Sequence, residues 1–177
     1  YEINFLALSG AVVFDMWDDE IHIRDLPEDP PKNAALFRVI DSGYSAHAAC
    51  NWIYLNEAGD RVRYRELYIQ RMAAPEFAKM VAALSKSEIY DRDIADPACW
   101  SETQGNPVSV AEQFRRNGIP NITKADSRDE RAGVSAVAST LFNSIARARG
   151  IPHSGGCAYF SSRCPHTIQE HKQATFR

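Results

Sequence analysis

Two aspartates stand where strand-like runs of this chain end. Asp41 ends the apolar run 34–41 and a Ser-Gly pair follows it, while Asp96 ends the shorter run 93–96 and a proline follows it. Carboxylates brought by two strands to one sheet edge supply the hard oxygen ligands that Mg²⁺ and Mn²⁺ prefer. Two such ions can clamp the attacking water and the leaving oxygen of a phosphodiester. The pattern therefore predicts metal-dependent phosphodiester hydrolysis, with Asp41 shared by both ions and Asp96 holding one.

Each of these acids also has a plainer interpretation. An aspartate before Ser-Gly or before proline commonly starts a turn, and only the combination of Asp41 with Asp96 favours a site. Glu66 is a third candidate, because it lies on the alternating strand 61–70 with Val62, Tyr64 and Tyr68 on its face. Facing inward, it would either act as a catalytic residue through water or pair with a neighbouring arginine.

The elements that must position these acids follow an α/β order. The spacing predicts strands over 35–41, 46–55, 61–70, 89–95 and 122–125, and helices over 76–86, 109–117 and 128–149, with a hairpin-like piece around Tyr159 and a last helix from Pro165. An irregular loop is expected over 98–108, and Asp91 and Asp93 are expected to be solvated. This order is that of a ribonuclease H-like fold, a mixed central sheet flanked by helices, with acids ending the first and fourth core strands.

Composition and charge restrict the class of protein. A chain of 177 residues with 45% apolar residues suits one folded domain. The net charge of -3 indicates no partner by itself, so DNA would need a local basic patch. The residues expected to meet DNA phosphates are Arg61, Arg63, Lys124 and Arg128, and a solvated face with ordinary ion pairs is the alternative for each.

The cysteines and the remaining motifs exclude other classes. Four scattered cysteines indicate a reducing compartment rather than a disulfide framework, and we see neither a signal peptide nor a membrane-spanning run. The group His153, Cys157, Cys164 and His166 has no standard zinc-finger spacing, so zinc is only an alternative. A phosphate-binding loop of the ATPase type and a nucleophile elbow are both absent from the sequence.

The chain resembles the C-terminal nuclease domain of the large terminase subunit of tailed bacteriophages. Segments 39–43 and 96–98 resemble its two acidic motifs, Arg131-Ala132-Gly133 resembles the start of its long helix, and segments 1–7 and 10–14 resemble the part that follows its motor ATPase. The resemblance implies a single nuclease domain over 1–177. Residues 1–33 would be the lead-in and linker from a missing ATPase domain, and residues 34–177 the ribonuclease H-like core.

The resemblance also implies an activity. Such domains cut concatemeric double-stranded viral DNA during genome packaging, in the host cytoplasm at the procapsid, using Mg²⁺ or Mn²⁺ held by three acids. Their further partners are the ATPase domain, the small terminase subunit and the portal. Asp41 and Asp96 match the first two acids. The third belongs to an Asp-His-x-x-Asp-type motif that we do not find before Arg177, and Glu170 is the nearest acid in a context that does not match.

Two other interpretations remain open at this stage. One is another ribonuclease H-like nuclease, such as a junction resolvase or a transposase core; a resolvase would recognise branched DNA and dimerise. The other is a docking module for DNA or portal protein that performs no catalysis and in which the acids are structural.

Overall fold

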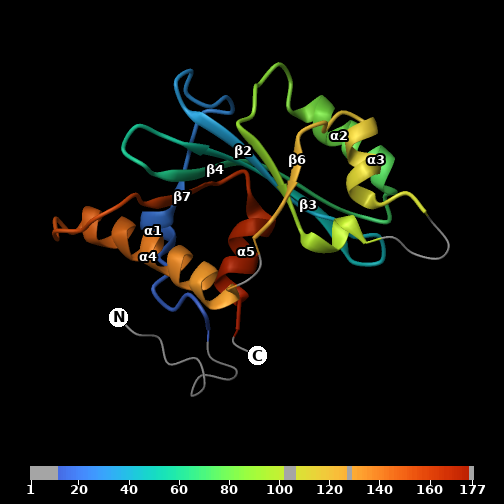
Figure 1. Ribbon diagram of the computed structural model, residues 1–177. Helices are drawn as coiled ribbons and strands as arrows, with labels where there is room; N and C mark the ends of the chain where they lie inside the picture. Colours follow the sequence, from blue (N-terminus) through green and yellow to red (C-terminus); the bar gives the residue numbers. More distant parts are fainter. Residues whose placement is uncertain (1–11, 102–106, 127–128, 176–177) are drawn as a thin grey trace.

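A mixed sheet of seven strands forms the centre of the computed structural model, which describes residues 12–101, 107–126 and 129–175 (Figure 1). The strands lie in the order β1-β7-β4-β3-β2-β5-β6. Their bounds are β1 Ile23–Arg24, β2 Ala35–Asp41, β3 His47–Leu55, β4 Arg61–Gln70, β5 Arg92–Ala95, β6 Ile122–Lys124 and β7 Ala158–Ser161. The ribonuclease H-like fold expected from the sequence is confirmed.

The middle five strands set the direction of the acidic positions. β2, β3 and β4 pair in antiparallel order, and β5 and β6 join the β2 edge in parallel. β2 and β5 therefore end at the same edge of the sheet. β7 pairs in parallel with both β1 and β4, so the hairpin-like piece predicted around Tyr159 is wrong. The partners of β7 lie far from it in the sequence, and a local sequence pattern does not indicate such long-range pairing.

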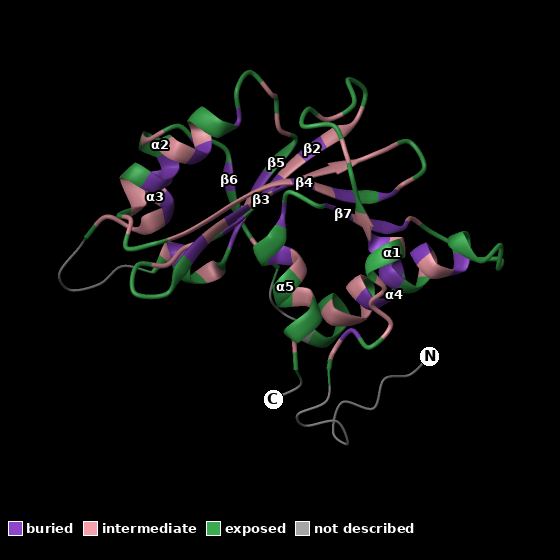
Figure 2. Ribbon diagram, turned by 180° about the vertical axis from the view of Figure 1, so that it is seen from behind, coloured by how far each residue is buried: buried purple, intermediate pink, exposed green. Residues whose placement is uncertain are grey.

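Helices cover the two faces of the sheet separately (Figure 1). Their bounds are α1 Asp19–His22, α2 Ala74–Leu84, α3 Val110–Arg116, α4 Glu130–Ala148 and α5 Pro165–Gln173, with a short 3₁₀ turn, η2, over Pro97–Trp100. α2 and α3 pack on one face through a core that includes Trp52, Phe77 and Phe114. α4 lies on the other face, in a second core with Leu141 and Phe160. Figure 2 shows that buried residues follow the strands and the inward sides of the helices.

A β-bulge changes which side chains of β4 share a face. The β3–β4 register shifts between Trp52 and Ile53, so one residue of β4 has no partner across the ladder. Tyr64 and Arg65 consequently both reach toward Glu88, on the α2 side. Glu66 instead contacts α5 on the opposite face. The predicted face shared by Tyr64 and Glu66 is therefore wrong.

Segment 12–24, which the sequence placed in a lead-in before the core, contributes to the folded body. β1 forms one edge of the sheet, and Phe14 and Trp17 pack in the second core. The fully buried His22 accepts a hydrogen bond from the Asp18 backbone N–H at Nδ1 and donates from Nε2 to the Leu141 carbonyl. This network ties the beginning of the described chain to α4.

The β3–β4 hairpin is held against the segment before β7. Gly156 lies so close to Gly59 that a Cβ atom at Gly156 would stand 1.8 Å from the Gly59 carbonyl oxygen. Asp60 accepts a hydrogen bond from the Cys157 backbone N–H at 2.8 Å and pairs with Arg147 of α4 at 2.7 Å. Of the helices in the described parts of the chain, none is long and apolar enough to cross a membrane.

Candidate functional site

Asp41 and Asp96 are brought together by the pairing of β2 with β5. The parallel register matches Ile40 with Ala95, and the Asp96 backbone N–H donates to the Ile40 carbonyl at 3.2 Å. The two aspartates are thus the next matched pair, on strands that typically lie about 4.8 Å apart. Ile40 and Ala95 are buried against α2 and α3, so strand alternation directs both aspartates to the opposite face.

The two carboxylates influence each other electrostatically. Partial burial raises the pKa of Asp41 above its ordinary value, and the negative charge of Asp96 raises it further, while a backbone hydrogen bond from Ser42 opposes both. The carboxylate of Asp96 also accepts from the Ala98 backbone N–H at 2.7 Å and caps the 3₁₀ turn. A pair of like charges in this position favours binding of a proton or a cation.

A second contact ties together the loops that carry the two acids. Ser42, directly after Asp41, lies with its hydroxyl oxygen 3.2 Å from the Cys99 sulfur atom of the 3₁₀ turn. Cys99 is buried, and burial is the main cause that raises the pKa of its thiol. The contact joins the segment that follows Asp41 to the segment that follows Asp96, so the fold sets the spacing of the two acids.

A buried ion pair fixes the register behind the acids. Arg38 donates from Nε and Nη2 to both carboxylate oxygens of Asp93, at 2.6 and 2.9 Å, and from Nη1 to the Ser85 hydroxyl at 2.9 Å. Its guanidinium also lies 4.2 Å from the centre of the Tyr90 ring. The prediction that Asp93 is solvated is therefore wrong, because its charge is satisfied by an arginine of the neighbouring strand.

The row that begins with the acids continues across the sheet. Asp41 is matched with Ala49 of β3, which is matched with Tyr68 of β4. The small Ala49 side chain thus separates Asp41 from the aromatic ring. Tyr68 lies between two imidazoles, with ring centres 4.5 Å from His47 and 4.4 Å from His166.

Helix α5 brings a further acid to this row. Burial is the main cause that raises the pKa of the Tyr68 hydroxyl, and the negative charges of Glu170, Glu66 and Asp41 raise it further. Glu170 and Asp41 thus both act on Tyr68, although the sequence context of Glu170 differs from the expected motif. The aromatic stack is a feature that the sequence analysis missed, since its members come from three separate elements.

Glu66 holds α5 in place. Its two carboxylate oxygens accept hydrogen bonds from the backbone N–H groups of His166 and Thr167 at 2.9 and 2.8 Å. This arrangement satisfies free donors in the first turn of the helix and places a negative charge at its positive end. The arginine partner considered for Glu66 does not occur among its contacts in the described residues, where the N-terminus of α5 takes its place.

The basic residues expected to contact DNA do not form one group around the acids. Arg63 is enclosed, with its guanidinium 4.6 Å from the centre of the Phe160 ring, and burial lowers its pKa to about 10. Arg61 is exposed at the start of β4, the end of that strand remote from Tyr68. Lys124 is exposed and is matched with the buried Ala95, on the face away from the acids. Arg128 lies outside the described residues.

The positions of the His, Cys, Asp and Glu side chains determine where a metal ion could bind. Within the described residues, no group of three or more His, Cys, Asp or Glu side chains is arranged to hold an ion. The zinc alternative fails on the same ground, since Cys157 and Cys164 are separately buried free thiols while His166 stacks on Tyr68. Asp41 and Asp96 offer an adjacent pair of carboxylates, which fits a divalent cation that keeps several waters.

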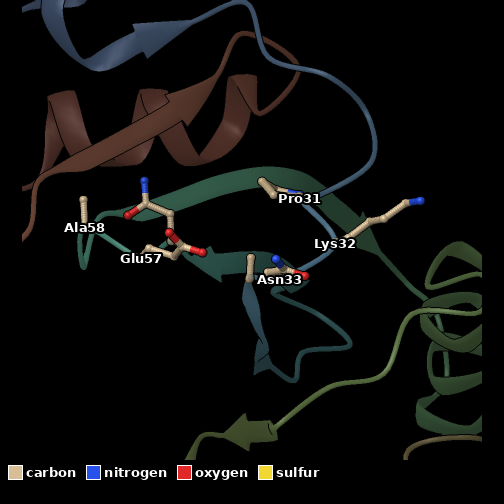
Figure 3. Close-up of a pocket in the computed structure, with 7 residues that line it drawn as sticks. Pro31, Lys32, Asn33, Glu57 and Ala58 are labelled. Atoms are coloured by element: carbon tan, nitrogen blue, oxygen red, sulfur yellow. The ribbon is translucent and has the colours of Figure 1, made fainter.

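A shallow pocket of about 440 Å³ lies elsewhere on the molecule (Figure 3). It is lined by the segment before β2, Pro31 to Ala34, and by Asn56, Glu57 and Ala58 of the β3–β4 hairpin. This location is at the beginning of β2, whereas Asp41 is at its end. The pocket is therefore separate from the acid pair.

Comparison with known proteins shows that the fold is similar to that of large terminase structures. No family model and no curated protein match the sequence. The large terminase from a thermophilic bacteriophage matches with a TM-score of 0.73 and 16% identity, over 99% of this chain and 42% of that one. The P22 large terminase nuclease domain matches with a TM-score of 0.72 and 11% identity, over 94% of this chain and 80% of that one.

A third protein extends the likeness to structures that contain metals. The large terminase nuclease from another thermophilic phage, G20c, with bound cobalt, matches with a TM-score of 0.58 and 14% identity, over 93% of this chain and 80% of that one. Another structure of the same nuclease has bound zinc. The chain thus has the fold of large terminase nucleases, and the resemblance found in the sequence is confirmed for the fold. It spans less than half of the first of these three proteins.

Proposed function

We propose that this chain is a metal-dependent endonuclease that cleaves concatemeric double-stranded viral DNA during genome packaging. The observation that carries the proposal is the placement of Asp41 beside Asp96 at the common end of two parallel strands. The fold likeness to terminase nucleases supports the substrate class. The metals in the G20c nuclease structures support the need for a cation.

In this proposal Asp41 and Asp96 would hold two Mg²⁺ or Mn²⁺ ions, and Asp41 would be the ligand that both ions share. The bound ions would lower the pKa of a water molecule and neutralise charge that develops on the phosphodiester. Repulsion between the two carboxylates would assist metal binding, because it favours binding of positive charge to the folded protein. Glu66, predicted to assist through water, caps α5 in this fold and so helps to position Glu170, whose charge acts on Tyr68.

The proposal also includes partners outside this domain. The chain matches only part of the first large terminase compared above, of which another structure contains ADP. We place this domain after an ATPase domain, with the small terminase subunit and the portal as further partners. Packaging would then occur in the host cytoplasm.

The direct test compares Asp41→Ala and Asp96→Ala with Asp25→Ala, which removes an exposed acid of the same chemistry elsewhere on the surface. Linear and plasmid duplex DNA are incubated with each protein and Mg²⁺ or Mn²⁺. We expect cleavage by the parent chain and by Asp25→Ala, and only background cleavage by the other two, with unchanged circular dichroism spectra.

A second measurement separates metal binding from cleavage. Titration with MnCl₂ should raise the melting temperature of the parent chain and leave that of Asp41→Ala unchanged. Equal cleavage by the parent chain and Asp41→Ala would overturn the nuclease proposal. A strong preference for four-way junctions over linear duplex would replace the packaging role with that of a resolvase.

A further inference from the structure

The chain ends β2 and β4 at the same edge of the sheet, and the segments beyond these two strands touch. The backbone N–H of Arg71, just after β4, donates to the carbonyl of Tyr44 at 3.0 Å. The side-chain amide of Gln70 donates to the Ser45 carbonyl beside it. We call Tyr44 and Arg71 the rim. Tyr44 lies just beyond the end of β2, which carries Asp41, and Arg71 lies just beyond the end of β4, which carries Tyr68.

The rim is built on a tight loop. A Cβ atom at Gly43 would lie 2.5 Å from the backbone oxygen of His47 and 2.8 Å from that of Ala46, so the chain folds closely on itself here. Together with the two hydrogen bonds to the end of β4, this close packing gives the loop a defined shape. Side chains on such a loop are presented in fixed positions, which lowers the entropic cost of binding a ligand.

Arg71 has an unusual backbone conformation for its residue type. Its φ angle is 61°, in the left-handed region, which costs a residue with a Cβ about 1 kcal/mol. Lys86, with φ of 54°, is the other described residue of this kind, and it pairs with Glu28 and Asp29. In the described parts of the chain, the exposed guanidinium of Arg71 makes neither a hydrogen bond nor an ion pair.

Tyr44, the second residue of the rim, is aromatic. It is 63% exposed, which is high for a large aromatic side chain, and it follows Asp41 by only three residues. A guanidinium binds phosphate oxygens in a two-pronged manner, and a tyrosine ring packs on sugar or base. Neither group reads base sequence when used this way.

We propose that the rim grips the backbone of the DNA strand beside the acid pair, with Arg71 on a phosphate and Tyr44 against the adjoining sugar or base. This inference rests on the proposed nuclease function for its choice of ligand. Three residues span at most about 10 Å, so Tyr44 lies within that distance of Asp41.

The test uses Arg71→Gly, with Lys86→Gly as a matched control in the same backbone conformation. Glycine adopts a positive φ without penalty, so neither change strains the loop, and Arg71→Gly should melt at or above the parent temperature. Binding of a 20-base-pair fluorescent duplex is measured by anisotropy in EDTA at several salt concentrations. We expect Arg71→Gly to weaken binding about tenfold and to lower the salt slope by about one ion.

Further variants identify which chemical group is responsible. Arg71→Lys should retain part of the affinity, and Tyr44→Phe should bind better than Tyr44→Ala. In cleavage assays with Mg²⁺, Arg71→Gly should raise KM and leave kcat nearly unchanged. Lys86→Gly should match the parent chain in every DNA measurement.

The outcomes separate this inference from the proposed function. Duplex binding that falls in Arg71→Gly supports the rim even when no cleavage is detected, in which case the nuclease proposal fails alone. Equal binding by Arg71→Gly and the parent chain overturns the rim, even when both cut DNA. A parent chain without affinity for the duplex overturns it as well.

Discussion

Replacement of His171 by phenylalanine tests how α5 is held against the sheet. The imidazole lies among aromatic rings, with its centre 5.5 Å from Phe14 and 4.8 Å from Phe160, and its Nδ1–H donates to the Thr167 carbonyl at 2.8 Å. Burial lowers the pKa of His171 from 6.5 to about 4, and the positive charge of Arg63 contributes in the same direction. Phenylalanine keeps the aromatic contacts and removes the group that takes up a proton.

The sign and size of the effect follow from linkage. The unfolded chain protonates His171 near pH 6.5, whereas the folded chain does so near pH 4, so between these values the unfolded state binds more protons. The stability contributed by neutral His171 is present above pH 6.5 and is lost as the pH falls toward 4. Between pH 7 and pH 4.5 the free energy of unfolding should fall by about 2 kcal/mol through this group alone.

Urea unfolding at pH 7, 5.5 and 4.5 measures this loss. All other groups titrate in both proteins, so the difference between parent and His171→Phe isolates the imidazole. The parent chain should lose about 2 kcal/mol more than the variant over this range. The same loss in both proteins would show that His171 is accessible to protons in the fold, and the packing argument for α5 would be refuted.

Two further substitutions test the supports of the site. Arg38→Met leaves the Asp93 carboxylate buried without its partner and should reduce the free energy of unfolding by about 3–5 kcal/mol. The double variant with Asp93→Leu should recover much of that loss in chemical denaturation, and no recovery would contradict the ion-pair explanation. Gly156→Ala places a methyl group against the Gly59 carbonyl and should cost about 1–3 kcal/mol. Gly133→Ala, where nothing lies within 4 Å in α4, should instead stabilise by up to about 1 kcal/mol, and a thermal melt in which both changes behave alike would contradict this reasoning.

The sequence was most informative where local rules decide the structure. β2 follows its apolar run to Asp41, and α3 begins at the Ser109 cap and ends before Gly118, whose φ is 108°. The adjacency of Asp41 and Asp96 could be predicted because each ends a core strand and the strand order followed from the succession of elements. The acid pair therefore needed no long-range information beyond the fold class.

Long-range contacts decided the features that were missed. Asp93 stands between charged and polar neighbours and looked solvated, but its partner Arg38 is 55 positions away. The strand around Tyr64 alternates cleanly in sequence, yet Tyr64 and Arg65 both bond to Glu88, and this fixes the bulge. Arg71 adopts the left-handed conformation where its backbone N–H donates to the Tyr44 carbonyl, and the conformational preference of arginine does not predict this.

The two edge strands of the sheet affect the tendency of this protein to aggregate at high concentration. β1 has two residues and β6 has three, so the outermost strands are the shortest in the sheet. Long uncovered edge strands pair with strands of other molecules and lead to aggregation. Very short edge strands offer few free backbone groups for such pairing. The two short edge strands of this protein should therefore limit strand pairing between molecules at high concentration.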